Sequence, residues 1–244
     1  MWLVLCDPGD LAGMWAYAGL RRRGLAPLEL LSPGDLLFSA RSVHRVDESG
    51  ASFEVDLPDG RVLASRDVDG VLNRAGYARV GALAFATEAD AGYAREELGA
   101  LLLSLLGCLA PVAVNRPCAT GLSGAWRPPA EWTVLAARAG LPAAPVRLSN
   151  RSEREPPPPG PDEGRVLVLG EQVFGARVPD EYAQACVRLA RLAGTDLLGI
   201  DLRRDGGHRT VFGGADPMPD LRLGGDAFLD RLLDRLTALP AAFR

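Results

Sequence analysis

The hydrophobic positions in the first half of the chain predict a parallel sheet. Residues 2–6 form a continuous apolar run, which is the pattern of a central strand covered on both faces. Asp10 can cap the helix that follows, and the apolar run at 28–31 should then form a strand parallel to the first. Two more apolar runs, at 68–73 and 112–114, continue the alternation of strand and helix. We therefore expect a doubly wound α/β sheet in this part.

Residues 42–64 interrupt that pattern with three short stretches in which apolar and polar positions alternate. The turn sequences Glu48-Ser49-Gly50 and Pro58-Asp59-Gly60 separate these stretches. This spacing predicts a three-stranded antiparallel meander inserted into the parallel pattern.

The last third of the chain has the pattern of a small α+β unit. Residues 165–178 predict a hairpin, and 180–193 predict an amphipathic helix. A second hairpin is expected over 197–212, with its turn at 205–207, and a final helix over 228–239.

A proline-rich segment separates the two parts. Residues 151–164 read RSEREPPPPGPDEG, and four consecutive prolines cannot join a sheet and favour a stiff extended linker. The sequence therefore predicts an α/β domain over 1–150, a linker over 151–164 and a smaller domain over 165–244.

Composition limits the functions that the chain can have. The 244 residues are 48% apolar and 24% charged, as in a globular protein, and the net charge of −4 gives no general attraction to nucleic acid or to an anionic membrane. The four cysteines form no C-x-x-C pair. Because three of them lie in apolar stretches, we expect buried free thiols and a reducing, cytoplasmic location.

All 27 basic residues are arginine, because the sequence contains no lysine. This excludes Schiff-base chemistry and any phosphate site that depends on a lysine. The sequence also lacks G-x-S-x-G, which makes a hydrolase of that type a poor hypothesis.

Polar residues follow two strands of the predicted parallel sheet. Asn73 and Arg74 end one strand, and Asn115 and Arg116 end the next. The carboxyl ends of parallel strands meet at one edge, which is where open α/β sheets bind ligands. The two arginines are therefore candidates for an anion-binding pair, or else for ordinary salt bridges.

The second hairpin brings two carboxylates to the same end of neighbouring strands. These are Asp201 and Asp216, which could share a cation. If no cation is bound there, we expect an arginine, such as Arg203 or Arg222, to neutralise one of them.

This hairpin also carries a resemblance to a known family. Residues 197–219, LLGIDLRRDGGHRTVFGGADPMP, resemble the last catalytic segment of ATP-grasp carboxylate–amine ligases, roughly G-x-D-(x)-D-G-(x)-F-x-E-x-N-P. Asp201 fits the Asp of that pattern and Pro217 fits the Pro. In the family, the Asp, Glu and Asn hold magnesium ions that bridge the ATP phosphates. Here Gly214 occupies the Glu position and Asp216 the Asn position.

The N-terminal half is similar in order and spacing to the ATP-grasp ligases that cross-link ribosomal peptides, the microviridin or graspetide type. The similar stretches are V-D-G-V-L-N-R, a helix opening A-R-E-E, V-A-V-N-R-P, and a helix ending A-G-L-P-x-x-P-V-R-L-S-N. Where the family has a lysine before the next helix, this chain has Trp126-Arg127. Where the family begins its lid subdomain, this chain has the proline linker. The resemblance thus implies an ATP-grasp-like layout that lacks the lid.

Two functions are consistent with this resemblance. The first is a degenerate bacterial relative, or pseudoenzyme, which needs no cofactor and acts in peptide modification as a binding or scaffold subunit. Its partner would be an active ATP-grasp ligase, a peptide substrate or a second copy of itself. It would dock where the absent lid leaves an apolar face of the C-terminal sheet.

The alternative is an active minimal ATP-dependent ligase. In that case Asp201 and Asp216 would hold Mg²⁺, and ATP would be a cofactor. The arginines that would replace the family's lysines at the phosphates are Arg74, Arg116, Arg127 and Arg177.

Overall fold

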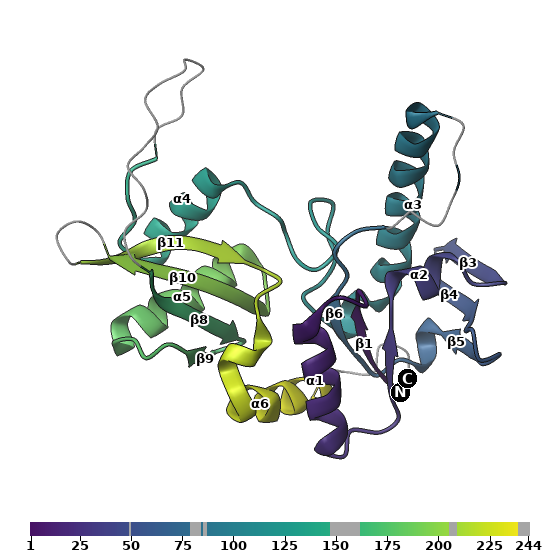
Figure 1. Cartoon of the computed structure of the whole chain (residues 1–244), viewed down its shortest axis with the longest axis horizontal. Coiled ribbons are helices and arrows are strands. Elements are labelled where there is room, and N and C mark those ends of the chain that lie inside the picture. Colours follow the sequence, from purple (N-terminus) through teal and green to yellow (C-terminus); the bar gives the residue numbers. More distant parts are fainter. Residues whose placement is uncertain (49, 79–83, 85–86, 147–161, 205–208, 239–244) are drawn as a thin grey trace. The chain divides into compact units, whose positions relative to one another are not determined.

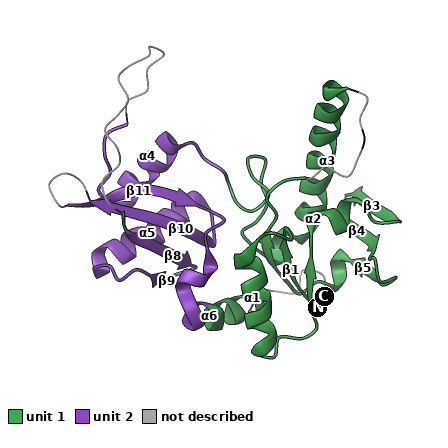
Figure 2. Ribbon diagram, in the orientation of Figure 1, with its two compact units in different colours: residues 1–125, 229–244 green, residues 126–228 purple. Residues whose placement is uncertain are grey.

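The computed structural model describes residues 1–48, 50–78, 84, 87–146, 162–204 and 209–238. Contacts between Cα atoms divide the chain into two compact units (Figure 2). Unit 1 comprises Met1–Ala125 together with Leu229–Arg244, and unit 2 comprises Trp126–Phe228.

Unit 1 is built on the expected parallel sheet, with strand order β2-β1-β6-β7 (Figure 1). The central strand β1 (Trp2–Cys6) pairs in parallel with β2 (Leu28–Leu31) and with β6 (Gly70–Arg74), which in turn pairs with β7 (Ala113–Val114). Residues from Leu3 to Cys6 are buried because helices cover both faces of β1. Burial on both faces explains why the apolar run at the start of the sequence is continuous.

One face of the parallel sheet packs on helix α3 (Glu88–Leu109) and on the meander. Leu3 and Leu5 of β1 belong to the same buried cluster as Leu102 and Leu106 of α3 and Phe53 of the meander. The meander consists of β3 (Ser42–Asp47), β4 (Gly50–Asp56) and β5 (Val62–Ala64), paired antiparallel in the predicted order. The short helix α2 is Pro33–Leu37.

Helix α1 (Leu11–Arg22) and the end of helix α6 (Gly225–Thr237) pack on the other face. Gly13 of α1 lies against Cys6 of β1 with no room for a side chain, and Gly19 lies against Leu229 of α6 in the same way. The backbone of Leu236 approaches Gly70. The chain thus returns to its first unit to complete the sheet's cover, which the sequence pattern did not predict.

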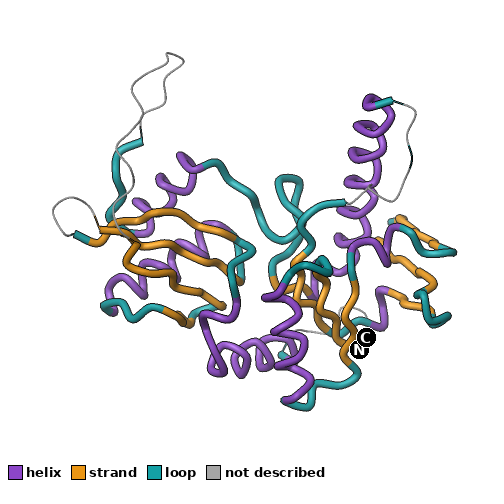
Figure 3. Tube along the Cα trace, in the orientation of Figure 1, coloured by secondary structure: helices purple, strands orange, loops and turns teal. Residues whose placement is uncertain are grey.

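Unit 2 contains an antiparallel sheet of order β11-β10-β8-β9 (Figure 3). The two predicted hairpins form it: β8 (Asp162–Leu169) with β9 (Gln172–Gly175), and β10 (Leu197–Arg204) with β11 (Thr210–Asp216). The predicted turn at 205–207 lies outside the described residues. Helices α4 (Pro129–Ala139) and α5 (Asp180–Ala193) cover one face of this sheet.

The second face of the unit 2 sheet is partly covered by the segment that leads into α6. Leu167, Leu169 and Leu197 are fully buried, as are Leu221 and Phe228 of this segment. The rings of Phe174 and Phe228 meet edge to face at 5.5 Å between centroids. The expectation of an exposed apolar face is therefore wrong for this part of the sheet, because the chain's own residues 221–228 cover it.

The predicted domain borders are not decided by these contacts. The predicted linker lies almost entirely within residues 147–161, which the structure does not describe. Helix α4 packs with the C-terminal sheet, and most of α6 packs with unit 1. None of the described helices is long and apolar enough to cross a membrane.

Candidate functional site

The first candidate site lies on the face of the unit 2 sheet that carries Asp201. Register places Asp201 of β10 directly between Arg165 of β8 and Gly214 of β11. Arg165 Nε donates to Asp201 Oδ1 at 2.5 Å, and its Nη2 donates to Oδ2 at 2.9 Å. Both side chains are partly shielded from water, with 33% and 20% exposed. A two-pronged ion pair of this kind holds both carboxylate oxygens in a fixed geometry.

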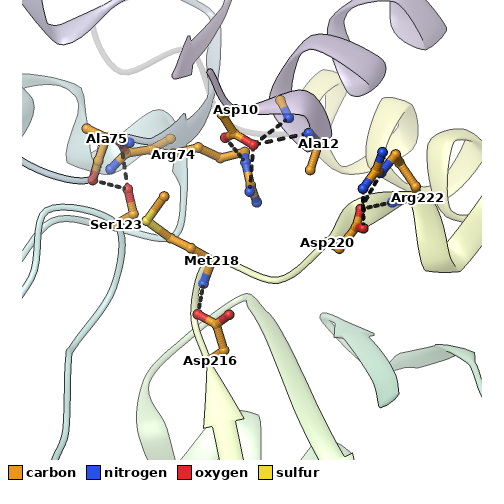
Figure 4. A network of polar contacts seen from close by, with 11 residues as sticks. Asp10, Ala12, Arg74, Ala75, Ser123, Asp216, Met218, Asp220 and Arg222 are labelled. Atoms are coloured by element: carbon orange, nitrogen blue, oxygen red, sulfur yellow. Dashed lines mark hydrogen bonds and ion pairs between the residues drawn. The ribbon is translucent and has the colours of Figure 1, made fainter. Parts of the chain in front are cut away.

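Asp216 lies on the same face as Asp201. It pairs with Gly199, two residues before Asp201 on β10, and side chains two apart on a strand share a face. The two aspartates are diagonal neighbours on adjacent strands, and the Cα atoms of such residues lie about 7–8 Å apart. Asp216 Oδ1 accepts a hydrogen bond of 2.7 Å from the Met218 amide (Figure 4).

Gly214 faces Asp201 across the hairpin without contributing a ligand. A Cβ at Gly214 would lie 3.7 Å from Asp201 Oδ2, which is ordinary van der Waals contact. The position therefore has room for a Cβ beside Asp201, but glycine supplies no side-chain oxygen. The described residues contain no group of three or more His, Cys, Asp or Glu that could hold a metal ion.

A magnesium ion prefers several oxygen ligands in octahedral geometry. The residues at this site do not provide them. Arg165 engages both oxygens of Asp201, Asp216 already accepts from Met218, and the position of the third ligand is glycine. The expected neutralising arginine exists, but it is Arg165. The prediction of Arg222 fails because that side chain pairs with Asp220 (Figure 4).

The second candidate site lies at the carboxyl edge of the parallel sheet in unit 1. Asn73 Nδ2 donates to the carbonyls of Asn115 (3.0 Å) and Leu122 (2.6 Å), while its Oδ1 accepts from the Ala75 amide at 3.2 Å. Ser123 Oγ donates to the Ala75 carbonyl at 2.9 Å (Figure 4). The network fixes the chain crossing after β6 and β7 through the side chain of Asn73 and the backbone carbonyl of Asn115, and a ligand-binding role of either side chain stays a prediction.

Arg74 is engaged by Asp10 at this edge. Its Nε donates to Asp10 Oδ2 at 2.6 Å and its Nη2 to Oδ1 at 3.1 Å (Figure 4). Only 4% of the Arg74 side chain and 13% of the Asp10 side chain are exposed. Asp10 Oδ1 also caps α1 by accepting from the amides of Ala12 and Gly13. Arg74 is thus engaged in a buried salt bridge, while Arg116 is exposed, and an anion-binding role of the two arginines stays a prediction.

The charge of this pair governs the pKa of Asp10. Burial alone would raise the pKa of its carboxyl, because an ion loses solvation in the interior. The hydrogen bonds and positive charge of Arg74, with the amides of α1, outweigh that effect and lower the pKa below its usual 3.8.

The remaining predicted arginines differ in their surroundings. Arg127 forms an ion pair with Glu131, donates to the Ala193 carbonyl at 3.3 Å, and lies over the Trp132 ring with 5.9 Å to its centroid. Arg177 is exposed. Their assignment to phosphate binding stays a prediction.

Arg127 and Asp216 line a groove of about 780 Å³ that lies wholly within unit 2. Its walls are the start of α4 with Trp126 and Arg127 before it, residues 144–146, the end of β10 at Arg203 and Arg204, and residues 211–217 of β11 and the turn after it. Sequence reasoning noted Trp126 and Arg203 but did not identify this groove. The signal that could have found it is Gly213-Gly214 in an expected edge strand, because glycine there exposes backbone.

Comparison with solved structures identifies the fold. No family model and no curated protein matches the sequence. Solved structures do match. The macrocyclase MdnB from Microcystis aeruginosa MRC superposes with a TM-score of 0.70 at 16% identity, covering 97% of this chain and 99% of that chain. The macrocyclase MdnC from the same organism, bound with precursor peptide MdnA, gives 0.74 at 12% identity, with 96% and 99% covered.

A third structure is the ATP-grasp ligase PsnB complexed with minimal precursor, Mg and ADP, with a TM-score of 0.68 at 19% identity and coverage of 98% and 97%. A RiPP-associated ATP-grasp ligase from Chryseobacterium gregarium gives 0.63 at 9% identity. These likenesses confirm the resemblance seen in the motifs at the level of the fold. The chain has the ATP-grasp-like fold of the ligases associated with ribosomally synthesised, modified peptides.

Proposed function

We propose that this chain is a non-catalytic peptide-binding protein with an ATP-grasp-like fold, acting as a binding subunit in peptide modification. The observation that carries the proposal is the ion pair between Arg165 and Asp201. Asp201 occupies the position of an aspartate that would hold a metal in an ATP-grasp ligase. Here it instead accepts two hydrogen bonds from the guanidinium group of Arg165.

Phosphoryl transfer depends on positioning and on neutralising the charge that develops on phosphate oxygens. Losing one preorganised group commonly costs about 3 kcal/mol of transition-state stabilisation. Here Gly214 supplies no oxygen, the sequence has no lysine, and Asp201 is occupied.

The peptide part of the proposal is supported by the compared structures. MdnC is described in complex with precursor peptide MdnA, and PsnB in complex with precursor peptide PsnA2. A chain that kept this fold without the metal ligands could retain the peptide-binding role. An active ATP-grasp ligase would then perform the chemistry.

The test measures ATP and peptide separately. Calorimetry should give no measurable heat of binding with Mg–ATP, whereas a precursor peptide of the kind bound by MdnC and PsnB should bind. An active ATP-grasp ligase, mixed with its peptide and Mg–ATP, should convert ATP to ADP and phosphate and form the dehydrated peptide faster when this chain is added, as followed by mass spectrometry. Dehydration of the peptide by this chain and ATP alone would overturn the proposal.

The alternative, an active minimal ligase, is favoured by one observation, the placement of Asp201 and Asp216 on the same face. A double variant separates the two functions. Arg165→Gln releases Asp201, and Gly214→Glu adds a carboxylate where the space allows one. We expect the double variant to bind Mn²⁺ more tightly than the natural chain. Tight Mn²⁺ or Mg–ATP binding by the natural chain would support the alternative.

A further inference from the structure

Strand β3 is the outer strand of the meander in unit 1 (Figure 1). Within the described residues, neither a further strand nor an isolated bridge pairs with its outer side. Arg45, Val46 and Asp47 are all exposed, although successive residues of a strand point to opposite faces. Val46 keeps 71% of its surface accessible to water. This end of the strand is therefore accessible from both faces.

The pairing of β3 with β4 decides which backbone groups of β3 point outward. Arg41 lies opposite Asp56 in the continued register, and the Asp56 amide donates to the Arg41 carbonyl at 2.9 Å. Bonded and non-bonded pairs alternate along antiparallel strands, so residues 43, 45 and 47 bond to β4. Residues 42, 44 and 46 direct their amide and carbonyl groups to the outer edge. Outward backbone groups of this kind are a template for another strand.

The strand lacks the usual devices that prevent such pairing. Residues 42–47 contain no proline, and the register of β3 with β4 runs without a bulge. The two charged side chains beside Val46 have opposite signs, since Arg45 precedes it and Asp47 follows it. A strand edge with charges of one sign would repel its own copy, whereas this edge carries both signs.

The order Arg45-Val46-Asp47 is self-complementary in an antiparallel pair. A two-fold axis at Val46 would place the valines of two copies opposite each other, and each Arg45 opposite the second copy's Asp47. The outward backbone groups of the two valines would then exchange two hydrogen bonds. Moving the axis by one residue would oppose two copies of Arg45 or two copies of Asp47, and like charges placed opposite each other are destabilising.

Asp47 can take part in this pairing although it already has an interaction within its own chain. Its carboxylate is exposed, and an ionised carboxylate offers several acceptor positions to donors. The charge complementarity therefore depends on the position of Asp47 along the edge and not on a missing partner.

From this edge and its register we propose that β3 pairs with β3 of a second copy of this chain, antiparallel and centred on Val46. The pairing joins two meanders into one continuous sheet. Because the contact is small, the dimer is expected to be weak and to form only as the concentration rises. An isologous contact of this kind closes on itself, so association stops at the dimer. The inference does not rest on the proposed function, since neither Arg165 nor Asp201 takes part.

The test measures sedimentation of the full chain from micromolar to millimolar concentration, with charge variants of the two paired residues. Arg45→Asp places aspartates opposite each other in both pairs, and Asp47→Arg places arginines there. Each variant alone should associate about tenfold more weakly, because two cross-strand pairs change from attraction to repulsion. An equimolar mixture of the two variants should dimerise like the natural chain, since every aspartate then faces an arginine.

Arg191→Asp is the matched control, because it makes the same change of charge at an exposed arginine of α5 in unit 2. It should leave the association unchanged, and circular dichroism should show that every variant is folded. A natural chain that stays monomeric up to millimolar concentration would overturn the proposal. Undiminished association of either single variant, or a mixture that stays monomeric, would overturn the pairing at Val46. Equal weakening by Arg191→Asp would assign the effect to net charge and overturn the role of β3.

Discussion

Replacing Asp10 by Asn tests the buried ion pair of unit 1. Asparagine caps a helix about as well as aspartate, so the change keeps the end of α1 and removes only the negative charge. Arg74 then loses its two-bond ion pair with Asp10, although only 4% of its side chain is exposed to water. Removing one partner of a buried pair costs about 3–5 kcal/mol, a large part of the 5–15 kcal/mol that stabilises a typical domain.

The free energy of unfolding should therefore fall by about 3–5 kcal/mol in urea titrations followed by circular dichroism. Asp10→Ala should lose about 1 kcal/mol more, because the cap is also removed. Glu88→Gln is the matched control in the same unit. Its carboxylate is 84% exposed beside Arg95, so about 0–1 kcal/mol is expected. A cost below 1 kcal/mol for Asp10→Asn would show that the pair does not stabilise the unit as argued.

Three further predictions follow from the described contacts. Because the folded pKa of Asp10 lies below 3.8, the stability that it contributes is complete above that pH and is lost as the pH falls through the folded pKa. The natural chain should thus lose more stability below about pH 4 than Asp10→Asn does in acid titrations. Half-buried Cys118 should react first with Ellman's reagent, whereas Cys186, whose pKa burial raises to about 12, should react only on unfolding; equal rates would contradict this. Gly19→Ala should destabilise by about 1–3 kcal/mol through its clash with Leu229, while Gly99→Ala, in open space on α3, should be neutral or slightly stabilising in the same urea assay.

Local patterns in the sequence predicted most of the elements. The alternation at 42–64 indicated the meander, and the cap at Asp10 indicated the start of α1, because both signals depend on neighbouring residues alone. The parallel sheet followed from continuous apolar runs joined by helices.

The contacts that decide the site are of longer range. Asp201 meets Arg165 because two hairpins pair in one register, and a one-residue slip would have turned the arginine to the other face. No periodicity in either segment contains that information, so Arg203 and Arg222 were equally reasonable expectations. The cover of the C-terminal sheet by residues 221–228 was missed for the same reason, since amphipathic α6 does not reveal which unit it packs on.

The return of α6 to unit 1 has a consequence for how this protein is made. Leu229 and Leu236 cover the face of the parallel sheet that begins at Trp2, but the ribosome adds them more than 220 residues after that strand. Until then, the α1 side of the sheet has only part of its apolar cover, and the nascent first unit cannot reach its final stability. Chaperone capture of emerging chains should therefore end only once residues 229–236 have left the exit tunnel.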